Sequence, residues 1–110
     1  MAFTPYHNIL GATARDNELV AIGDLPKSGI KSVQLTNIHG SAAATIDLYL
    51  YKDSTDTTSD ETYYFLKDYQ IAYRGYLILD DLYLLNFDNS TYSLHIATGG
   101  SDTVDVMIRK

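Results

Sequence analysis

Apolar and polar residues alternate along much of this chain with a period of two. In residues 44–51, for example, Ile46 and Leu48 alternate with Asp47 and Tyr49. Successive side chains of a β-strand point to opposite faces, so this alternation predicts strands that bury one face. No window of about 11 residues shows the apolar spacing of a helix. We therefore expect strands over residues 18–22, 30–37, 44–51, 62–66, 75–79, 92–96 and 104–108.

Polar turn residues separate these strands, at 23–29, 39–41, 53–60, 80–81, 88–90 and 99–100. Short strands at intervals of about ten residues are typical of an all-β sandwich or small barrel. We expect an antiparallel two-sheet β-sandwich of about 7–8 short strands, jelly-roll-like or Ig-like. Strands 30–37 and 44–51 should pair around a short turn, and Gly99-Gly100 should make a tight reversal. Segment 82–87 is strongly apolar and is expected along the edge of the core.

The N-terminal segment shows no clear period, and a proline and a glycine interrupt it. Its apolar side chains Phe3, Tyr6 and Ile9 need a place to dock. One interpretation is an extended arm that docks on a neighbouring subunit or partner. The other is a tail that packs on its own domain. We therefore divide the chain into an extended N-terminal arm, residues 1–17, and a β-sandwich domain, residues 18–110.

Length and charge limit the classes of function. The 110 residues are enough for one domain with one core. The chain carries 8 basic and 14 acidic side chains, so its net charge of −6 makes nucleic acid and anionic membranes poor partners. Cysteine is absent, which excludes disulfides and thiolate metal sites. No run approaches the ~20 apolar residues of a membrane span, and no secretory signal is visible.

The sequence contains no recognisable catalytic constellation. It lacks a Gly-x-Ser-x-Gly nucleophile elbow and a glycine-rich phosphate loop, and its acidic residues fall mostly in turns. We therefore expect that the protein is not an enzyme and uses no cofactor. Asn89-Ser90-Thr91 matches the glycosylation pattern, but without a secretory signal this tripeptide carries little weight.

Residues that could ligate a metal are present but scattered. A zinc site needs three or four converging ligands. The histidines fall instead in the expected arm, a turn and an outward strand face; they are His7, His39 and His95. The 53–60 loop lacks the central glycine and closing glutamate of a helix–loop–helix calcium site. Its aspartates are Asp53, Asp56 and Asp60. We expect a solvated loop and no metal site, although non-helical calcium loops are not excluded by this test.

Tyrosine stands out, with 10 residues and no tryptophan. Tyr49 and Tyr51 share the expected outward face of one strand, and Tyr76 and Ile78 share that of another. If the two strands are neighbours, these side chains form an exposed patch, and such patches usually mark a contact surface. Alternatively, the arm or segment 67–74 covers the patch, or the rings stack on sugars. The candidate interface residues are Phe3, Tyr6, Ile9, Tyr49, Tyr51, Tyr76 and Ile78.

Six strand motifs follow one another in a recognisable order. They are KSVQLTN at 31–37, TIDLYL at 45–50, YFLK at 64–67, YLILD at 76–80, YSLHI at 92–96 and VDVMI at 104–108. A strand that ends in Asn37 precedes a turn of small residues, and a Val-x-Val-x-Ile strand closes the domain. This pattern resembles the small β-sandwich virion proteins of tailed bacteriophages, especially marine and cyanobacterial phages. The resemblance covers roughly residues 18–110.

The resemblance implies a structural component of a virion, assembled in the host cytoplasm. Such proteins bind other virion subunits and are often trimeric, so we expect a homo-oligomer with a trimer favoured. The expected function is capsid decoration: a cement protein that binds major-capsid subunits through the tyrosine face and the N-terminal arm. The acidic charge fits a basic capsid surface. A head–tail connector or tail/baseplate subunit is the alternative. A carbohydrate-binding module is the alternative from another class.

Overall fold

The computed structural model describes residues 5–10, 17–27, 29–38, 41–52, 61–99 and 103–110. These residues form eight β-strands and one short helix. The elements are β1 (Tyr6–Leu10), β2 (Asn17–Val20), β3 (Ser32–Asn37), β4 (Ala44–Lys52), β5 (Glu61–Ile71), β6 (Tyr76–Leu79), α1 (Leu82–Leu85), β7 (Ser93–Thr98) and β8 (Thr103–Arg109). The near absence of helix agrees with the period-two pattern of the sequence.

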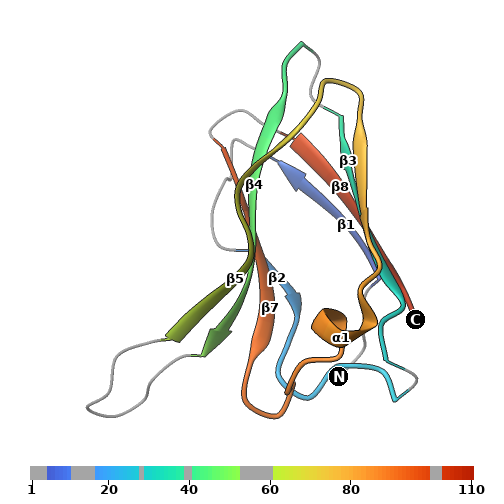
Figure 1. Cartoon of the computed structure of the whole chain (residues 1–110), viewed down its shortest axis with the longest axis vertical. Coiled ribbons are helices and arrows are strands. Elements are labelled where there is room, and N and C mark those ends of the chain that lie inside the picture. Colours follow the sequence, from blue (N-terminus) through green and yellow to red (C-terminus); the bar gives the residue numbers. More distant parts are fainter. Residues whose placement is uncertain (1–4, 11–16, 28, 39–40, 53–60, 100–102) are drawn as a thin grey trace.

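The strands form two antiparallel sheets of four that face each other (Figure 1). Sheet A has the order β1-β8-β3-β6, and sheet B has the order β2-β7-β4-β5. The first strand therefore pairs with the eighth, the second with the seventh, the third with the sixth and the fourth with the fifth. A long hairpin wrapped around itself produces this order, which is that of a jelly roll. The predicted two-sheet sandwich is confirmed, and the strand order selects the jelly roll over the Ig-like topology.

The core between the sheets consists mainly of aliphatic side chains that alternate along the strands with outward-facing ones. In β3, Val33 and Leu35 are fully buried, whereas Gln34 and Thr36 on the opposite face are only half-buried. Other fully buried aliphatic side chains are Ile30, Ile46, Leu48, Leu85, Leu94, Ile96, Val104 and Val106. Burying one such side chain contributes roughly 1.5–3 kcal/mol, so contact between the two sheets is the main source of stability.

Two predicted strand pairings are wrong. β3 and β4 do not pair with each other, because β3 lies in sheet A and β4 in sheet B. β7 and β8 likewise lie in different sheets, so the chain crosses between the layers instead of making a hairpin after β7. A few residues at about 3.3 Å each can span the roughly 10 Å between packed sheets, so a short turn does not imply a hairpin. Residues 39–40 and 100–102 lie outside the described residues.

For residues 5–10 the structure agrees with the second interpretation of the N-terminal segment, which packs on its own domain instead of reaching a neighbour. β1 is an edge strand of sheet A and pairs antiparallel with β8. The carbonyl of Pro5 accepts a hydrogen bond from Ile108 N at 2.7 Å, and Ile9 is 6% exposed within the core. Residues 5–10 therefore belong to the sandwich, and the domain does not begin at residue 18. Residues 1–4 and 11–16 lie outside the described residues.

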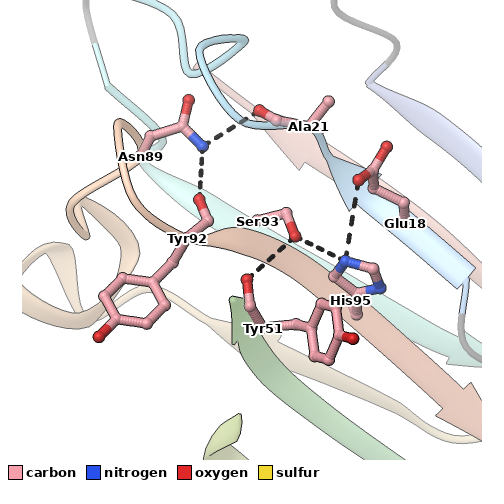
Figure 2. Close-up of polar contacts among 7 residues, drawn as sticks. All are labelled: Glu18, Ala21, Tyr51, Asn89, Tyr92, Ser93 and His95. Carbon is pink, nitrogen blue, oxygen red and sulfur yellow. Dashed lines mark hydrogen bonds and ion pairs between the residues drawn. The ribbon is translucent and has the colours of Figure 1, made fainter. Parts of the chain in front are cut away.

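Asn89 links two loops at one end of the sandwich (Figure 2). Its side-chain nitrogen donates to the carbonyls of Ala21 at 3.1 Å and Tyr92 at 3.0 Å. Its side-chain oxygen accepts from Leu25 N at 2.8 Å. The β2–β3 loop and the start of β7 are therefore held together by one buried amide. These bonds use the side-chain nitrogen to which a glycan would be attached. Asn89 of the Asn89-Ser90-Thr91 tripeptide therefore has a structural role that is separate from glycosylation.

Asn37 has the same role at the opposite end. It ends β3 with its side chain 2% exposed, and its amide nitrogen lies 2.9 Å from the carbonyl of Ala42 and 3.1 Å from that of Ile71. The Ala72 carbonyl lies 3.2 Å from the same nitrogen. One side chain therefore joins the β3–β4 and β5–β6 links. Carbonyl groups that leave a strand need such partners when they are buried.

Candidate functional site

The outer surface of sheet A combines side chains from all four of its strands. They are Tyr6 and Asn8 of β1, Asp105 and Met107 of β8, Gln34 and Thr36 of β3, and Tyr76 and Ile78 of β6. We call this set the sheet A face. The strand register arranges it in two rows, one from Tyr6 to Ile78 and the other from Asn8 to Tyr76. Tyr6 is 70%, Tyr76 64% and Ile78 47% exposed, so this face presents apolar area to solvent.

A depression of about 410 Å³ lies on the sheet A face. Its lining includes Tyr6, Asn8, Thr36, Asp105 and Met107. The Asp105 carboxylate accepts a hydrogen bond of 2.6 Å from the Asn8 side-chain amide. The depression therefore combines an aromatic ring and a thioether with a single carboxylate.

Tyr49 and Tyr51 lie on the other side of the molecule. Their strand, β4, belongs to sheet B, whereas β6 with Tyr76 belongs to sheet A. The two strands are therefore not neighbours, and their side chains do not form one combined patch. Tyr49 is only 9% exposed, because its ring contacts Tyr64 at 5.4 Å and His95 at 5.7 Å between ring centres.

Sheet B carries a polar network around His95 on its outer face (Figure 2). Ser93 and His95 stand two positions apart on β7, so they share one face. Ser93 Oγ lies 2.7 Å from His95 Nε2 and 3.2 Å from the carbonyl of Tyr51. Glu18, paired with His95 across β2 and β7, places Oε2 3.8 Å from the same Nε2 atom. Both His95 and Ser93 are buried, and the Tyr51 ring meets the imidazole edge-on at 5.3 Å.

This serine, histidine and acid do not form a nucleophilic triad. In a triad the acid holds Nδ1 while the serine hydroxyl donates to Nε2. Here Ser93 Oγ and Glu18 Oε2 both lie close to Nε2 of His95, so the acid does not hold the ring nitrogen opposite the serine. The network instead fills the outer face of sheet B with paired polar groups. The spacing of Ser93 and His95 could have shown a shared face, but only the β2–β7 register brings in Glu18.

A second polar cluster lies at the end of the β4–β5 hairpin. Glu61 Oε1 accepts hydrogen bonds from the hydroxyls of Tyr63 at 3.0 Å and Tyr92 at 3.2 Å. Its Oε2 lies 3.6 Å from Lys52 Nζ. The Tyr63 hydrogen bond, aided by the Lys52 charge, holds the pKa of Glu61 below its ordinary value. The same hydrogen bond raises the pKa of Tyr63, and burial together with the Glu61 charge raises the pKa of Tyr92.

Helix α1 presents a second apolar surface. The Asp81 carboxylate accepts from Tyr83 N at 2.9 Å and so caps the helix N-terminus. The expectation that 82–87 lies along the core holds for Leu85, which is fully buried. Leu82 is 55% and Tyr83 93% exposed, however. Part of this apolar segment therefore packs in the core and part faces solvent, a division that the sequence pattern did not predict.

The candidate interface residues are thus separated into three groups. Tyr6, Tyr76 and Ile78 converge on the sheet A face. Ile9 lies in the core, which excludes it from an interface in this state. Tyr49 and Tyr51 pack around His95 in sheet B. Phe3 lies outside the described residues. Asn8, Asp105 and Met107 were not expected at a site, because only the strand register places them beside Tyr6.

Within the described ranges, no three or more His, Asp or Glu side chains gather in a group that could hold a metal ion. His39, Asp53, Asp56 and Asp60 lie outside those ranges. In the same part of the chain, no helix has the length and apolarity to cross a membrane.

Comparison with protein-family models, curated proteins and solved structures gives no match to this chain.

Proposed function

We propose that this chain is a non-enzymatic structural protein of a tailed-phage virion, which decorates the capsid by binding major-capsid subunits. The proposed assembled form is a trimer on the particle surface. The order of strand motifs and the net charge of −6 support this function. The observation that carries it is the sheet A face, where Tyr6 on one edge strand and Tyr76 and Ile78 on the other are all exposed on the same side of the sheet. Exposed aromatic and aliphatic side chains that share a face are typical of protein contact surfaces.

The size of this face favours a partner that offers many fixed sites. Four strands about 4.8 Å apart, with two rows of side chains, cover roughly 200–300 Å². A stable pair of free proteins usually buries about 800 Å² on each partner. One sheet A face therefore gives weak binding, which several linked copies on a repeating lattice would strengthen through avidity. A capsid shell provides such a lattice, and a trimer would present three faces to it.

Two other functions fit the fold less well. A head–tail connector or tail subunit would use the same kind of surface. It would occupy a single ring of sites on each particle, whereas a decoration protein occupies sites over the whole capsid. A carbohydrate-binding module needs accessible rings, and Tyr49 is 9% exposed beneath its neighbours. Tyr76 remains available for stacking, so a glycan array with the Tyr76→Ala variant as control would reveal that activity.

The first experiment locates the protein. Mass spectrometry of purified particles should detect this chain at a copy number comparable to that of the major capsid protein. Absence of the chain from particles would overturn the virion assignment. A copy number equal to that of a single ring would instead identify the protein as a connector subunit.

The second experiment tests the surface. Recombinant protein is added back to particles that lack it, and bound copies are counted. Tyr76→Ala and Ile78→Asp should reduce occupancy at least severalfold, because both remove apolar contact area. Tyr83→Ala on α1 serves as the matched control and should bind normally. If Tyr83→Ala alone abolishes binding, α1 and not the sheet A face is the contact surface.

A further inference from the structure

The depression on the sheet A face contains the carboxylate of Asp105. Asp105 lies in the centre of β8, with Asn8 and Thr36 as its cross-strand neighbours. Asn8 is a neutral donor, bonded to Asp105 Oδ1 at 2.6 Å. In the part of the chain that the structure describes, no Lys or Arg forms an ion pair with this carboxylate. The nearest basic position along β8 is Arg109, four residues or roughly 13 Å away.

The surroundings of Asp105 provide apolar walls. The exposed Tyr6 ring and Met107 line the same depression and face each other across β1 and β8. A side chain with an apolar stem and a cationic head would contact these walls and reach the carboxylate at its end. The guanidinium of arginine fits best, because it stacks on aromatic rings and offers a planar set of donors to a carboxylate.

We propose that the depression receives an arginine side chain of the partner protein, with its guanidinium against Tyr6 and paired with Asp105. The inference deepens the proposed function, since it names the chemistry by which the sheet A face recognises a capsid subunit. The net charge of −6 draws a basic surface towards the protein, and Asp105 provides the specific contact. The orientation of the partner is then fixed by one ion pair, set among the apolar and neutral polar side chains of the sheet A face.

The test uses the full-length protein labelled with ¹⁵N and free blocked arginine as the probe. Blocked citrulline, which has almost the same shape but no charge, is the matched ligand control. The measurement is made near neutral pH, and the depression is also lined by His7. Arginine should shift the signals of the Asn8 side-chain amide and of the Asp105 backbone, and citrulline should shift them far less.

Two charge-matched variants separate a specific site from general attraction. Asp105→Asn and Asp80→Asn each remove one negative charge, but Asp80 lies in the link between β6 and α1. Asp105→Asn should abolish the arginine-dependent shifts, and Asp80→Asn should retain them. Equal shifts in the two variants, or equal shifts with arginine and citrulline, would overturn the proposed arginine site.

Add-back to particles distinguishes failure of this inference from failure of the proposed function. Asp105→Asn should reduce occupancy at least fivefold, with Asp80→Asn near wild type. If the wild-type protein binds particles and Asp105→Asn binds equally well, the arginine site is wrong and capsid decoration stands. If the wild-type protein does not bind particles, capsid decoration is wrong, and the arginine titration still decides whether the site exists.

Discussion

Asn89 illustrates how a single polar side chain can determine the geometry of a loop region. The link before β3 and the link before β7 contain irregular backbone, whose polar groups cannot be paired by strand ladders. The Asn89 amide provides these partners, with three side-chain bonds between 2.8 and 3.1 Å in a position that is 8% exposed. The same residue type at Asn37 joins the links at the opposite end. A buried amide offers both donors and an acceptor, so it can join several backbone groups at once.

Replacing Asn89 with alanine should therefore destabilise the fold. The change leaves Leu25 N and the carbonyls of Ala21 and Tyr92 without this partner, at an expected cost of about 1–3 kcal/mol. In a domain of this size, each kcal/mol lowers the melting temperature by about 4 °C. Thermal unfolding followed by circular dichroism measures the shift.

Ser90→Ala is the matched control for Asn89→Ala. It disrupts the same tripeptide, but Ser90 is exposed and bonds only its neighbour Asp88. Its melting temperature should stay within about 2 °C of wild type, since exposed substitutions usually change stability by less than 0.5 kcal/mol. Equal destabilisation by both variants would show that the turn, and not the Asn89 amide, holds the loops together.

At the scale of elements, the sequence predicts which face of a strand is buried better than it predicts where the strand ends. The expected strand at 62–66 is part of β5, which continues to Ile71. The β4–β5 register is irregular on both sides of Leu48, and Asp68 adopts a φ of 52° while its N donates to Asp47 at 2.7 Å. Such bulges add residues to one strand and break the alternation, so the period-two pattern cannot follow the strand through them.

The β4–β5 hairpin should show a pH dependence that originates at Glu61. Its pKa is held below the ordinary value, chiefly by the Tyr63 hydrogen bond and also by Lys52. A depressed folded-state pKa stabilises the folded protein above the unfolded pKa of about 4.3, and this stability is lost as the pH falls through the folded value. Melting temperatures of the wild type and Glu61→Gln are compared between neutral and acidic pH.

Glu61→Gln should lower the melting temperature at neutral pH and have a smaller effect in acid. The difference between the two proteins should therefore shrink as the pH falls below about 4.3, where the unfolded chain takes up the proton, and be smallest below the depressed folded-state pKa, where the carboxyl is protonated in both states. Asp80→Asn, at an exposed position, is the control and should follow the wild type throughout. A constant difference at every pH would mean that shape, and not charge, determines the effect at Glu61.

At the scale of the whole molecule, alternation determines which side chains are buried but not which strands become neighbours. The alternation buries Val33 and Leu35 of β3 in the core and leaves Tyr76 and Ile78 of β6 on an outward face. Tyr49 was also correctly placed outward on its strand, yet it covers the opposite sheet from Tyr76. The jelly roll pairs strands far apart in sequence, and no local pattern contains that information. For this reason the sheet A face and its Asp105 depression required the structure.

The pairing of the first strand with the last leads to a final prediction. β1 closes sheet A by covering β8, and Ile9 is buried opposite Val104. Deleting residues 1–10 removes a core side chain, at a cost of about 2–5 kcal/mol, and exposes the edge of β8. Small domains have only about 5–15 kcal/mol of stability, so the truncated protein should lose its sharp unfolding transition and aggregate.

Deleting residues 1–4 leaves β1 in place and should preserve the transition. Thermal unfolding and size-exclusion chromatography compare the two variants with the full-length protein. If the 1–10 deletion still unfolds sharply near the wild-type temperature, β1 is a dispensable arm and not a part of the sandwich.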